Sequence, residues 1–217
     1  MNESNSTISG KSPSKSLQIQ DIHTSWIKQL PNGELIEKLR ETPSSRASLS
    51  EFIKQYLPLN EINDADEFTK ELLLSDPEDL HEVVLKAGVT QFSNNIRLII
   101  TKKAVITLKE SLGEDLYNFS LNEASNITQE VEVPSTQKFM EGREPLSQVI
   151  NMGYKSLRIA LEDSADDCKY KLPKQWDDEY SSNENSDAYT NNGSNFHKSL
   201  IYNIININKI TPVNQSF

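Results

Sequence analysis

The chain has few residues of the kinds that build covalent, metal or nucleophilic centres. It contains one cysteine, Cys168, and three histidines among 217 residues. A single cysteine excludes a disulfide within the chain and favours a reducing compartment. The histidines lie far apart, and none has a second histidine or a cysteine at metal-ligand spacing, so no metal site is predicted.

Motifs for binding phosphate or activating a nucleophile are also missing. The sequence has no Gly-X-X-X-X-Gly-Lys or Gly-X-Gly-X-X-Gly loop and no Gly-X-Ser-X-Gly elbow. Cys168 follows Asp166 and Asp167, whose charges oppose formation of a thiolate. We therefore expect a protein that is not an enzyme and that binds no cofactor.

Long apolar runs and clusters of positive charge are absent as well. No stretch approaches the ~20 apolar residues that cross a bilayer, and the N-terminus lacks the apolar segment of a secretory signal. The net charge is −10 and no basic stripe is found, so neither nucleic-acid binding nor direct membrane insertion is expected. A mixed acidic surface favours a soluble, intracellular protein with protein partners.

The sequence does contain closely spaced helical signals, which predict an all-α fold. Apolar residues recur at helical spacing over residues 49–57 and 144–162. Ser75 and Asp76 before Pro77 indicate a helix start, and we expect that helix to end near Gly88, where a left-handed cap is common. Further helices are expected over residues 90–100, 102–112 and 114–124, with a left-handed turn at Gly113 and a close helix crossing at Gly153.

These signals divide the chain into three parts. Residues 1–20 have little to bury and are predicted to be disordered. Residues 21–176 are predicted to form a single compact helical domain, and residues 177–217 a polar linker with a short apolar tail. The tail, residues 200–210, either folds back onto the body, docks on a partner, or is an aggregation-prone end.

Four short motifs follow one another between residues 23 and 176. They are His23-Thr24-Ser25-Trp26-Ile27, the helices around Gly88 that end in Leu112-Gly113-Glu114 with Tyr117 and Phe119, then Gly153-Tyr154-Lys155-Ser156-Leu157, and finally Lys171-Leu172-Pro173. In this order they resemble the SctK (YscK) family, the K component of the type III secretion sorting platform.

The resemblance implies a cytosolic adaptor without catalytic activity. Members of that family join the cytoplasmic domain of the inner-membrane ring protein SctD to the pod protein SctQ. Through SctQ they hold the SctL stalk and the SctN ATPase, at the cytoplasmic face of the inner membrane of a Gram-negative bacterium. Most motif residues are interpreted as fold determinants, namely Trp26, Gly88, Gly113, Glu114, Tyr117, Phe119, Gly153, Leu172 and Pro173.

Two groups of residues on the matched helices are candidates for binding partners. The first comprises Arg97, Lys102, Lys103 and Lys109, and the second comprises Tyr154, Lys155 and Arg158. Arginine and aromatic side chains often anchor protein interfaces. The alternative is that these residues are solubilising charges with no binding role.

Three other functions stay open from the sequence alone. The Ser- and Asn-rich N-terminus fits a type III export signal, which makes a secreted effector the main alternative. A secretion chaperone would need an α/β dimer surface, whereas strand signals are almost absent. An unrecognised enzyme would be tested by mutating His81 and Cys168 together.

Overall fold

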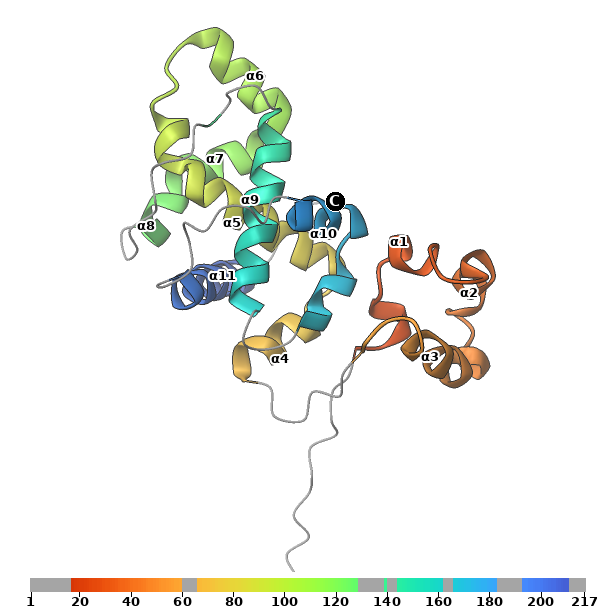
Figure 1. Cartoon of the computed structure of the whole chain (residues 1–217). Helices are drawn as coiled ribbons and strands as arrows, with labels where there is room; N and C mark the ends of the chain where they lie inside the picture. Colours follow the sequence, from red (N-terminus) through yellow and green to blue (C-terminus); the bar gives the residue numbers. More distant parts are fainter. Residues whose placement is uncertain are drawn as a thin grey trace, which may run out of the picture.

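The computed structural model describes residues 17–59, 66–128, 139, 144–161, 166–182 and 193–210. Within these ranges the protein is all-α, which confirms the predicted fold class, and no strand occurs among them. The 3-10 helices are η1 (Ile19–Asp21), η2 (Pro43–Ser45) and η3 (Asp166–Lys171). The α-helices in Figure 1 are α1 (Thr24–Ile27), α2 (Gly33–Leu39), α3 (Arg46–Lys54), α4 (Glu67–Leu74), α5 (Pro77–Arg97), α6 (Lys102–Leu112), α7 (Glu114–Asn122), α8 (Ala124–Thr128), α9 (Pro145–Leu161), α10 (Lys174–Ser182) and α11 (Gly193–Ile210).

The centre of the fold is the crossing of α5 with α9. Gly88 of α5 lies directly against the backbone of α9, so that a Cβ atom at Gly88 would overlap the carbonyl oxygen of Val149. A Cβ atom at Gly153 of α9 would likewise overlap the carbonyl oxygen of Val84. The two glycines therefore allow a backbone approach that no larger residue permits, which confirms the close crossing predicted at Gly153.

Gly88 does not end a helix, contrary to the prediction. The helix α5 runs without interruption from Pro77 to Arg97, so the segments expected to be separate helices before and after Gly88 are one. A glycine inside a helix costs about 1 kcal/mol relative to alanine, and the close packing on α9 offsets that cost. Whether Gly88 ends a helix or lies inside one depends on packing against α9, which follows some sixty residues further along the chain.

Gly113 separates α6 from α7, as predicted. Its φ is 80° and its ψ is 159°, a backbone conformation that favours glycine. The φ is positive as expected, but the ψ is extended rather than left-handed helical. A Cβ atom at this position would meet nothing within 4 Å, so the conformation alone explains the glycine. Tyr117 and Phe119 of α7 are then buried in the core, in the role expected of them.

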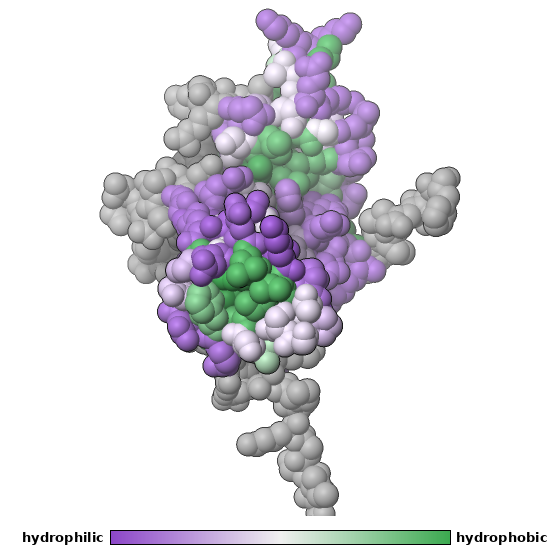
Figure 2. Space-filling view, turned by 90° about the vertical axis from the view of Figure 1, so that its right-hand side faces the viewer, coloured by the Kyte–Doolittle hydropathy of each residue, from purple (hydrophilic) through white to green (hydrophobic). Residues whose placement is uncertain are grey.

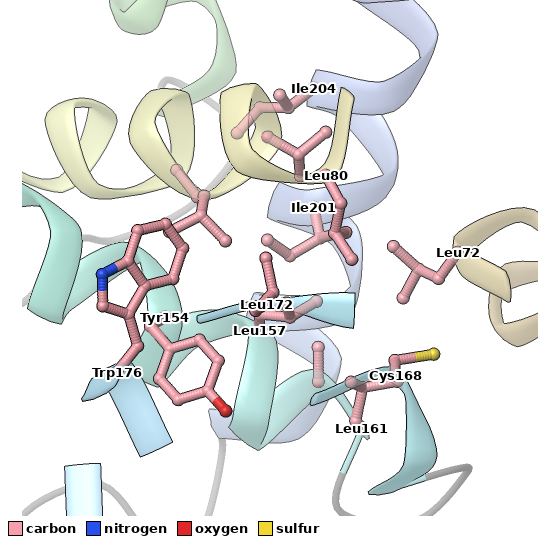
Figure 3. Packing of buried hydrophobic residues seen from close by; sticks show 14 of the residues in the cluster. Leu72, Leu80, Tyr154, Leu157, Leu161, Cys168, Leu172, Trp176, Ile201 and Ile204 are labelled. Carbon is pink, nitrogen blue, oxygen red and sulfur yellow. The ribbon is translucent and has the colours of Figure 1, made fainter. Parts of the chain in front are cut away.

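The C-terminal segment belongs to the core rather than forming a polar tail. The helix α11 packs against α9 and α5, and its Ile201 and Ile204 lie beside Leu80 and Leu157 (Figure 3). The boundary set at residue 176 is therefore wrong, because both α10 and α11 continue the fold. Of the three alternatives for the tail, folding back is the one observed. Residues 183–192 of the predicted linker lie outside the described residues.

Helices η1 to α3 form an N-terminal lobe, residues 17–57, which lies beside the helical body formed by α4 to α11 (Figure 1). Leu17 and Ile19 are buried in this lobe. Residues 17–20 are thus part of the fold, which corrects the extent of the predicted disordered segment, and residues 1–16 lie outside the described residues.

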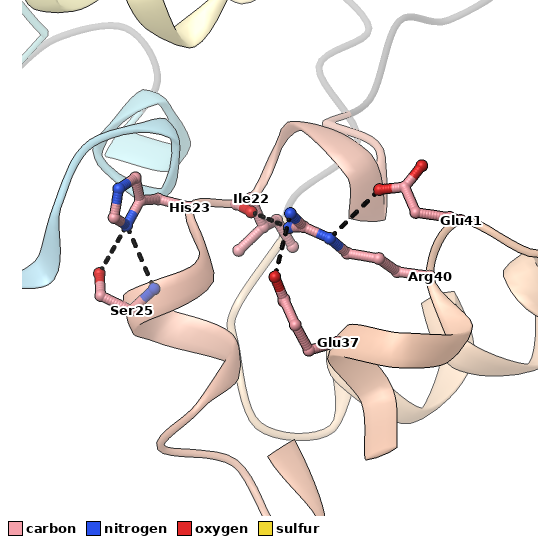
Figure 4. Close-up of polar contacts among 6 residues, drawn as sticks. All are labelled: Ile22, His23, Ser25, Glu37, Arg40 and Glu41. Atoms are coloured by element: carbon pink, nitrogen blue, oxygen red, sulfur yellow. Dashed lines mark hydrogen bonds and ion pairs between the residues drawn. The ribbon is translucent and has the colours of Figure 1, made fainter. Parts of the chain in front are cut away.

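Polar contacts hold the short helices of the lobe together (Figure 4). His23 caps α1, with its Nδ1 accepting a hydrogen bond from the backbone N–H of Ser25 at 3.1 Å. Arg40, after α2, donates from Nη1 to the carbonyl oxygen of Ile22 at 2.9 Å and pairs with Glu37 at 3.2 Å and Glu41 at 3.4 Å. Helices this short are not stable alone, so the lobe depends on these tertiary contacts.

The first and last motifs of the sequence meet where the lobe joins the body. The indole Nε1 of Trp26 donates to the carbonyl oxygen of Leu172 at 2.9 Å. The backbone N–H of Lys174, at the start of α10, donates to Oγ of Ser25 at 2.9 Å. Segments about 150 residues apart in sequence thus form one junction, which gives both motifs a structural role.

Lys171 of the last motif is buried and caps α4. Its Nζ donates to the carbonyl oxygens of Leu73 and Ser75, the latter at 2.7 Å. These oxygens lie at the C-terminus of α4, where the helix dipole favours a positive charge. Burial lowers the pKa of Lys171, and the two carbonyl groups supply the hydrogen bonds that a buried ammonium group needs.

Candidate interaction surfaces

The turn between α5 and α6 exposes aliphatic side chains to solvent. Leu98 is 79% exposed and Ile100 is 86% exposed, the largest fractions among the large apolar residues that the structure describes. Ile106, on the outer face of α6, is 44% exposed. Single exposed apolar residues are common, whereas a group of them marks an interaction site.

Two lysines border these aliphatic residues. Lys102 and Lys103 occupy the first turn of α6, and both side chains are exposed. Because residues three and four apart share a helix face, both lysines lie next to Ile106. We call Leu98, Ile100, Lys102, Lys103 and Ile106 the tip surface, and Figure 1 shows α6 at the upper end of the body.

Arg97 and Lys109, the other cations predicted in this group, have partners within the chain. Nη2 of Arg97 donates to the carbonyl oxygen of Leu121 at 2.6 Å. Nζ of Lys109 donates to Oε1 of Glu114 at 2.9 Å, and this bond raises the pKa of Lys109 and lowers that of Glu114. Both cations therefore help to join α5 and α6 to α7, and the structure brings only Lys102 and Lys103 of this group to the tip surface.

The residues of the second predicted group do not form one exposed binding surface. The ring of Tyr154 is 1% exposed, and its hydroxyl donates to Oδ1 of Asp177 at 3.2 Å. Arg158 lies near the same carboxylate, with Nε 3.8 Å from Oδ1. Lys155 is partly buried, and burial lowers its pKa. Tyr154 thus belongs to the core that Figure 3 shows around Trp176.

The N-terminal lobe carries a second exposed apolar surface. Figure 2 shows a patch of apolar side chains over this lobe, surrounded by hydrophilic ones. Leu35 of α2 is 56% exposed and Tyr56, after α3, is 47% exposed. The ring of Tyr56 lies against that of Phe52, with 5.0 Å between the ring centroids. We call Leu35, Phe52 and Tyr56, the exposed or half-buried apolar residues of α2 and of the C-terminal end of α3, the lobe surface.

Sequence reasoning missed the lobe surface because helical spacing of apolar residues does not show which of them are covered. In α2 the neighbouring Ile36 is buried while Leu35 is exposed, and in α3 Ile53 is buried. No local signal separates Leu35 from Ile36, because adjacent apolar residues are buried together elsewhere in this fold, as at Val83 and Val84. The same holds for Leu98 and Ile100, which were expected at the end of a helix.

The surroundings of Cys168 and of His81 indicate structural roles. Cys168 is fully buried, and burial raises the pKa of its thiol to about 12, so the thiolate nucleophile does not form near neutral pH. His81 packs edge-to-face on Trp176 with 5.1 Å between the ring centroids. Over the part of the chain that the structure describes, no three His, Cys, Asp or Glu residues are grouped as metal ligands.

None of the described helices is long and apolar enough to cross a membrane. The chain matches no protein-family model, no curated protein and no solved structure. The function of the protein is therefore inferred from the surfaces described above and from the motifs of the sequence.

Proposed function

We propose that this protein is a non-catalytic adaptor of a type III secretion sorting platform. In this role it links the cytoplasmic domain of an SctD-like ring protein to an SctQ-like pod protein at the cytoplasmic face of the inner membrane. Through the pod protein it would reach the SctL stalk and the SctN ATPase indirectly.

The observation that carries the proposal is the presence of two exposed apolar surfaces on different parts of one helical fold. The tip surface lies at the turn between α5 and α6, and the lobe surface lies on α2 and around the C-terminal end of α3. A protein that joins two others needs two surfaces that can be occupied together. Exposed apolar residues rimmed by polar ones are the usual composition of such interfaces.

The ordered motifs support the same proposal. The structure gives their residues roles that determine the fold: Gly88 and Gly153 at the helix crossing, Gly113 at a turn, and Trp26 and Leu172 at the lobe junction. Residues that determine a fold point to proteins with the same fold, and the role is carried over from them by analogy, because a fold alone does not imply a function. The exposed surfaces then supply the binding.

Each surface has only a few apolar anchors, so we expect interfaces at the small end of the range for specific complexes. Small interfaces exchange readily. Such exchange suits a sorting platform, whose components turn over as substrates are delivered.

Co-purification of the full chain with each of the two partners tests the proposal. We expect the chain to bind the SctQ-like protein and the cytoplasmic domain of the SctD-like protein, and to bring both into one complex. Capture of neither protein would refute the adaptor. Appearance of the protein in the culture medium during active secretion would instead indicate an effector.

A further inference from the structure

We infer that the tip surface docks into an apolar pocket bordered by carboxylates on a protein partner. The inference rests on the proposed function, and it specifies the chemistry of one of the two interfaces. It is carried by the shape of the α5–α6 turn, by its exposed side chains, and by the distribution of charge around it.

The turn presents aliphatic side chains on a protruding part of the molecule. Leu98 and Ile100 are exposed, while Ile99 between them packs against the core. The exposed side chains on either side of the partly buried Ile99 therefore belong to a short turn that is fixed at both ends by α5 and α6. A rigid apolar projection of this kind fits a concave pocket, since pre-ordered anchors lose little conformational freedom on binding.

The charge at the tip has the opposite sign to that of the whole chain. The net charge is −10, yet residues 97–109 include four basic residues and no acidic one. Arg97 and Lys109 are engaged with α7, as described above. Lys102 and Lys103 remain exposed beside the aliphatic pair, and a partner that complements them carries carboxylates at the rim of its pocket.

The position of these lysines is unfavourable for the helix itself. The N-terminus of a helix carries a partial positive charge, so acidic residues stabilise it and basic ones do not. The helices α5 and α7 follow this rule, with Glu78 and Asp79 or Glu114 and Asp115 in their first turns. The helix α6 begins with two lysines and has no acid in its first turn. Helix stability therefore does not account for the two lysines.

A protein pocket explains the tip better than an anionic bilayer does. An anionic bilayer repels a chain whose net charge is −10 unless clustered basic residues face it. Two free lysines offer little attraction to set against that repulsion. A pocket contacts only the tip, and Glu110 lies eight residues beyond Lys102, roughly 12 Å along the helix and about one Debye length away.

The test measures binding of the full chain to each immobilised partner, for the wild type and for three double variants. Leu98→Ser with Ile100→Ser removes the aliphatic pair, and Lys102→Glu with Lys103→Glu reverses the charge. Leu35→Ser with Tyr56→Ser, at the lobe surface, is the matched control. All six residues are exposed, so the variants should fold, which circular dichroism and urea unfolding will verify.

We expect the aliphatic variant to raise the Kd for one partner at least about tenfold and to leave the other partner unaffected. The charge variant should slow association with that same partner about tenfold at low salt and flatten its dependence on salt. The lobe control should leave binding of this partner unchanged.

The outcomes separate this inference from the proposed function. If the wild type binds neither partner, the adaptor itself is refuted. If the wild type binds both and neither tip variant weakens either complex, the adaptor stands and the tip inference is overturned. A third outcome would also overturn the tip inference and assign the tip to a membrane. In that outcome the wild type sediments with phosphatidylglycerol vesicles, and the aliphatic variant does not, although it still forms both protein complexes.

Discussion

The helical body and the N-terminal lobe are stabilised in different ways. In the body, long helices cross at close range and bury a continuous set of aliphatic side chains, with Gly88 and Gly153 at the closest point. In the lobe, helices of four, seven and nine residues are joined by side-chain contacts such as those of His23 and Arg40. The body depends on the packing of long helices, whereas the lobe combines a smaller apolar core, which includes Ile22, Ile27 and Ile53, with polar contacts and its junction with the body.

This difference predicts which region opens first. The free energy of opening follows local packing and the number of buried contacts. The lobe is attached to the segment from η3 to α10 through a few hydrogen bonds, including that from Trp26 to Leu172, and through the edge-to-face contact of Trp26 with Tyr170. We therefore expect the lobe to open at a lower free energy than the body, which would let the lobe surface adjust to a partner while the tip surface stays rigid.

The largest effect is expected from Gly88→Ala in the body. The added Cβ overlaps the carbonyl oxygen of Val149, so the α5–α9 crossing must separate, at a cost of more than about 3 kcal/mol in the free energy of unfolding. Urea unfolding measures this cost. Asn94→Ala, at an exposed position on the same helix, is the control and should change the free energy by less than about 0.5 kcal/mol. Equal stabilities of the two variants would contradict the packing described for the body.

A pH effect of intermediate size is expected from His197 on α11. Its ring is 2% exposed, its Nδ1 has no hydrogen-bond partner among the described residues, and burial lowers its pKa from 6.5 to about 4. The unfolded chain therefore binds a proton at higher pH than the folded one does. Stability from this group is complete above pH 6.5 and falls as the pH drops toward 4, by up to about 3 kcal/mol.

The measurement compares the free energy of unfolding at pH 7 and pH 4 for the wild type and His197→Phe. The variant should lose less stability on acidification, because the remaining titrating groups are common to both proteins. Parallel pH profiles would show that His197 is not buried against the body, and would restore the view of α11 as a loose tail.

The smallest effect is expected from Trp26→Phe at the lobe junction. The substitution keeps an aromatic ring but leaves the carbonyl oxygen of Leu172 without its donor, which costs about 1–2 kcal/mol. Hydrogen exchange should become faster over residues 23–57 and stay unchanged in α5. Trp176→Phe in the body is the matched control, since Trp176 packs on His81 and Tyr154. If Trp26→Phe accelerates exchange in α5 as much as in the lobe, the two regions unfold together and are not distinct.

Much of the fold could be predicted from local signals. Pro77 preceded by Asp76 gave the start of α5, and Gly113 gave the break between α6 and α7. The apolar spacing of residues 144–162 gave α9, which begins at Pro145 and ends at Leu161. These features depend on propensity, capping and periodicity, which act within a few residues of the chain.

The candidate surfaces could be predicted only in part. The basic residues Lys102 and Lys103 were expected to be exposed and are, whereas Tyr154 was expected to be accessible and is buried. An aromatic residue with a polar atom suits both a core and an interface. Whether it is covered depends on Asp177 and Trp176, which meet Tyr154 only in the tertiary structure.

The amino-acid sequence by itself determined that this protein is helical, where α6, α7 and α9 begin and end to within two residues, and that its one thiol lies in surroundings that oppose ionisation. The tertiary structure decided that Gly88 lies at a helix crossing, that α11 completes the core, and that Leu35 faces solvent beside a buried Ile36. The physical reason is the distance along the chain over which each effect acts. Helix propensity and capping act between near neighbours in sequence. Burial depends on which distant segment covers a residue, and only the packed fold specifies that segment.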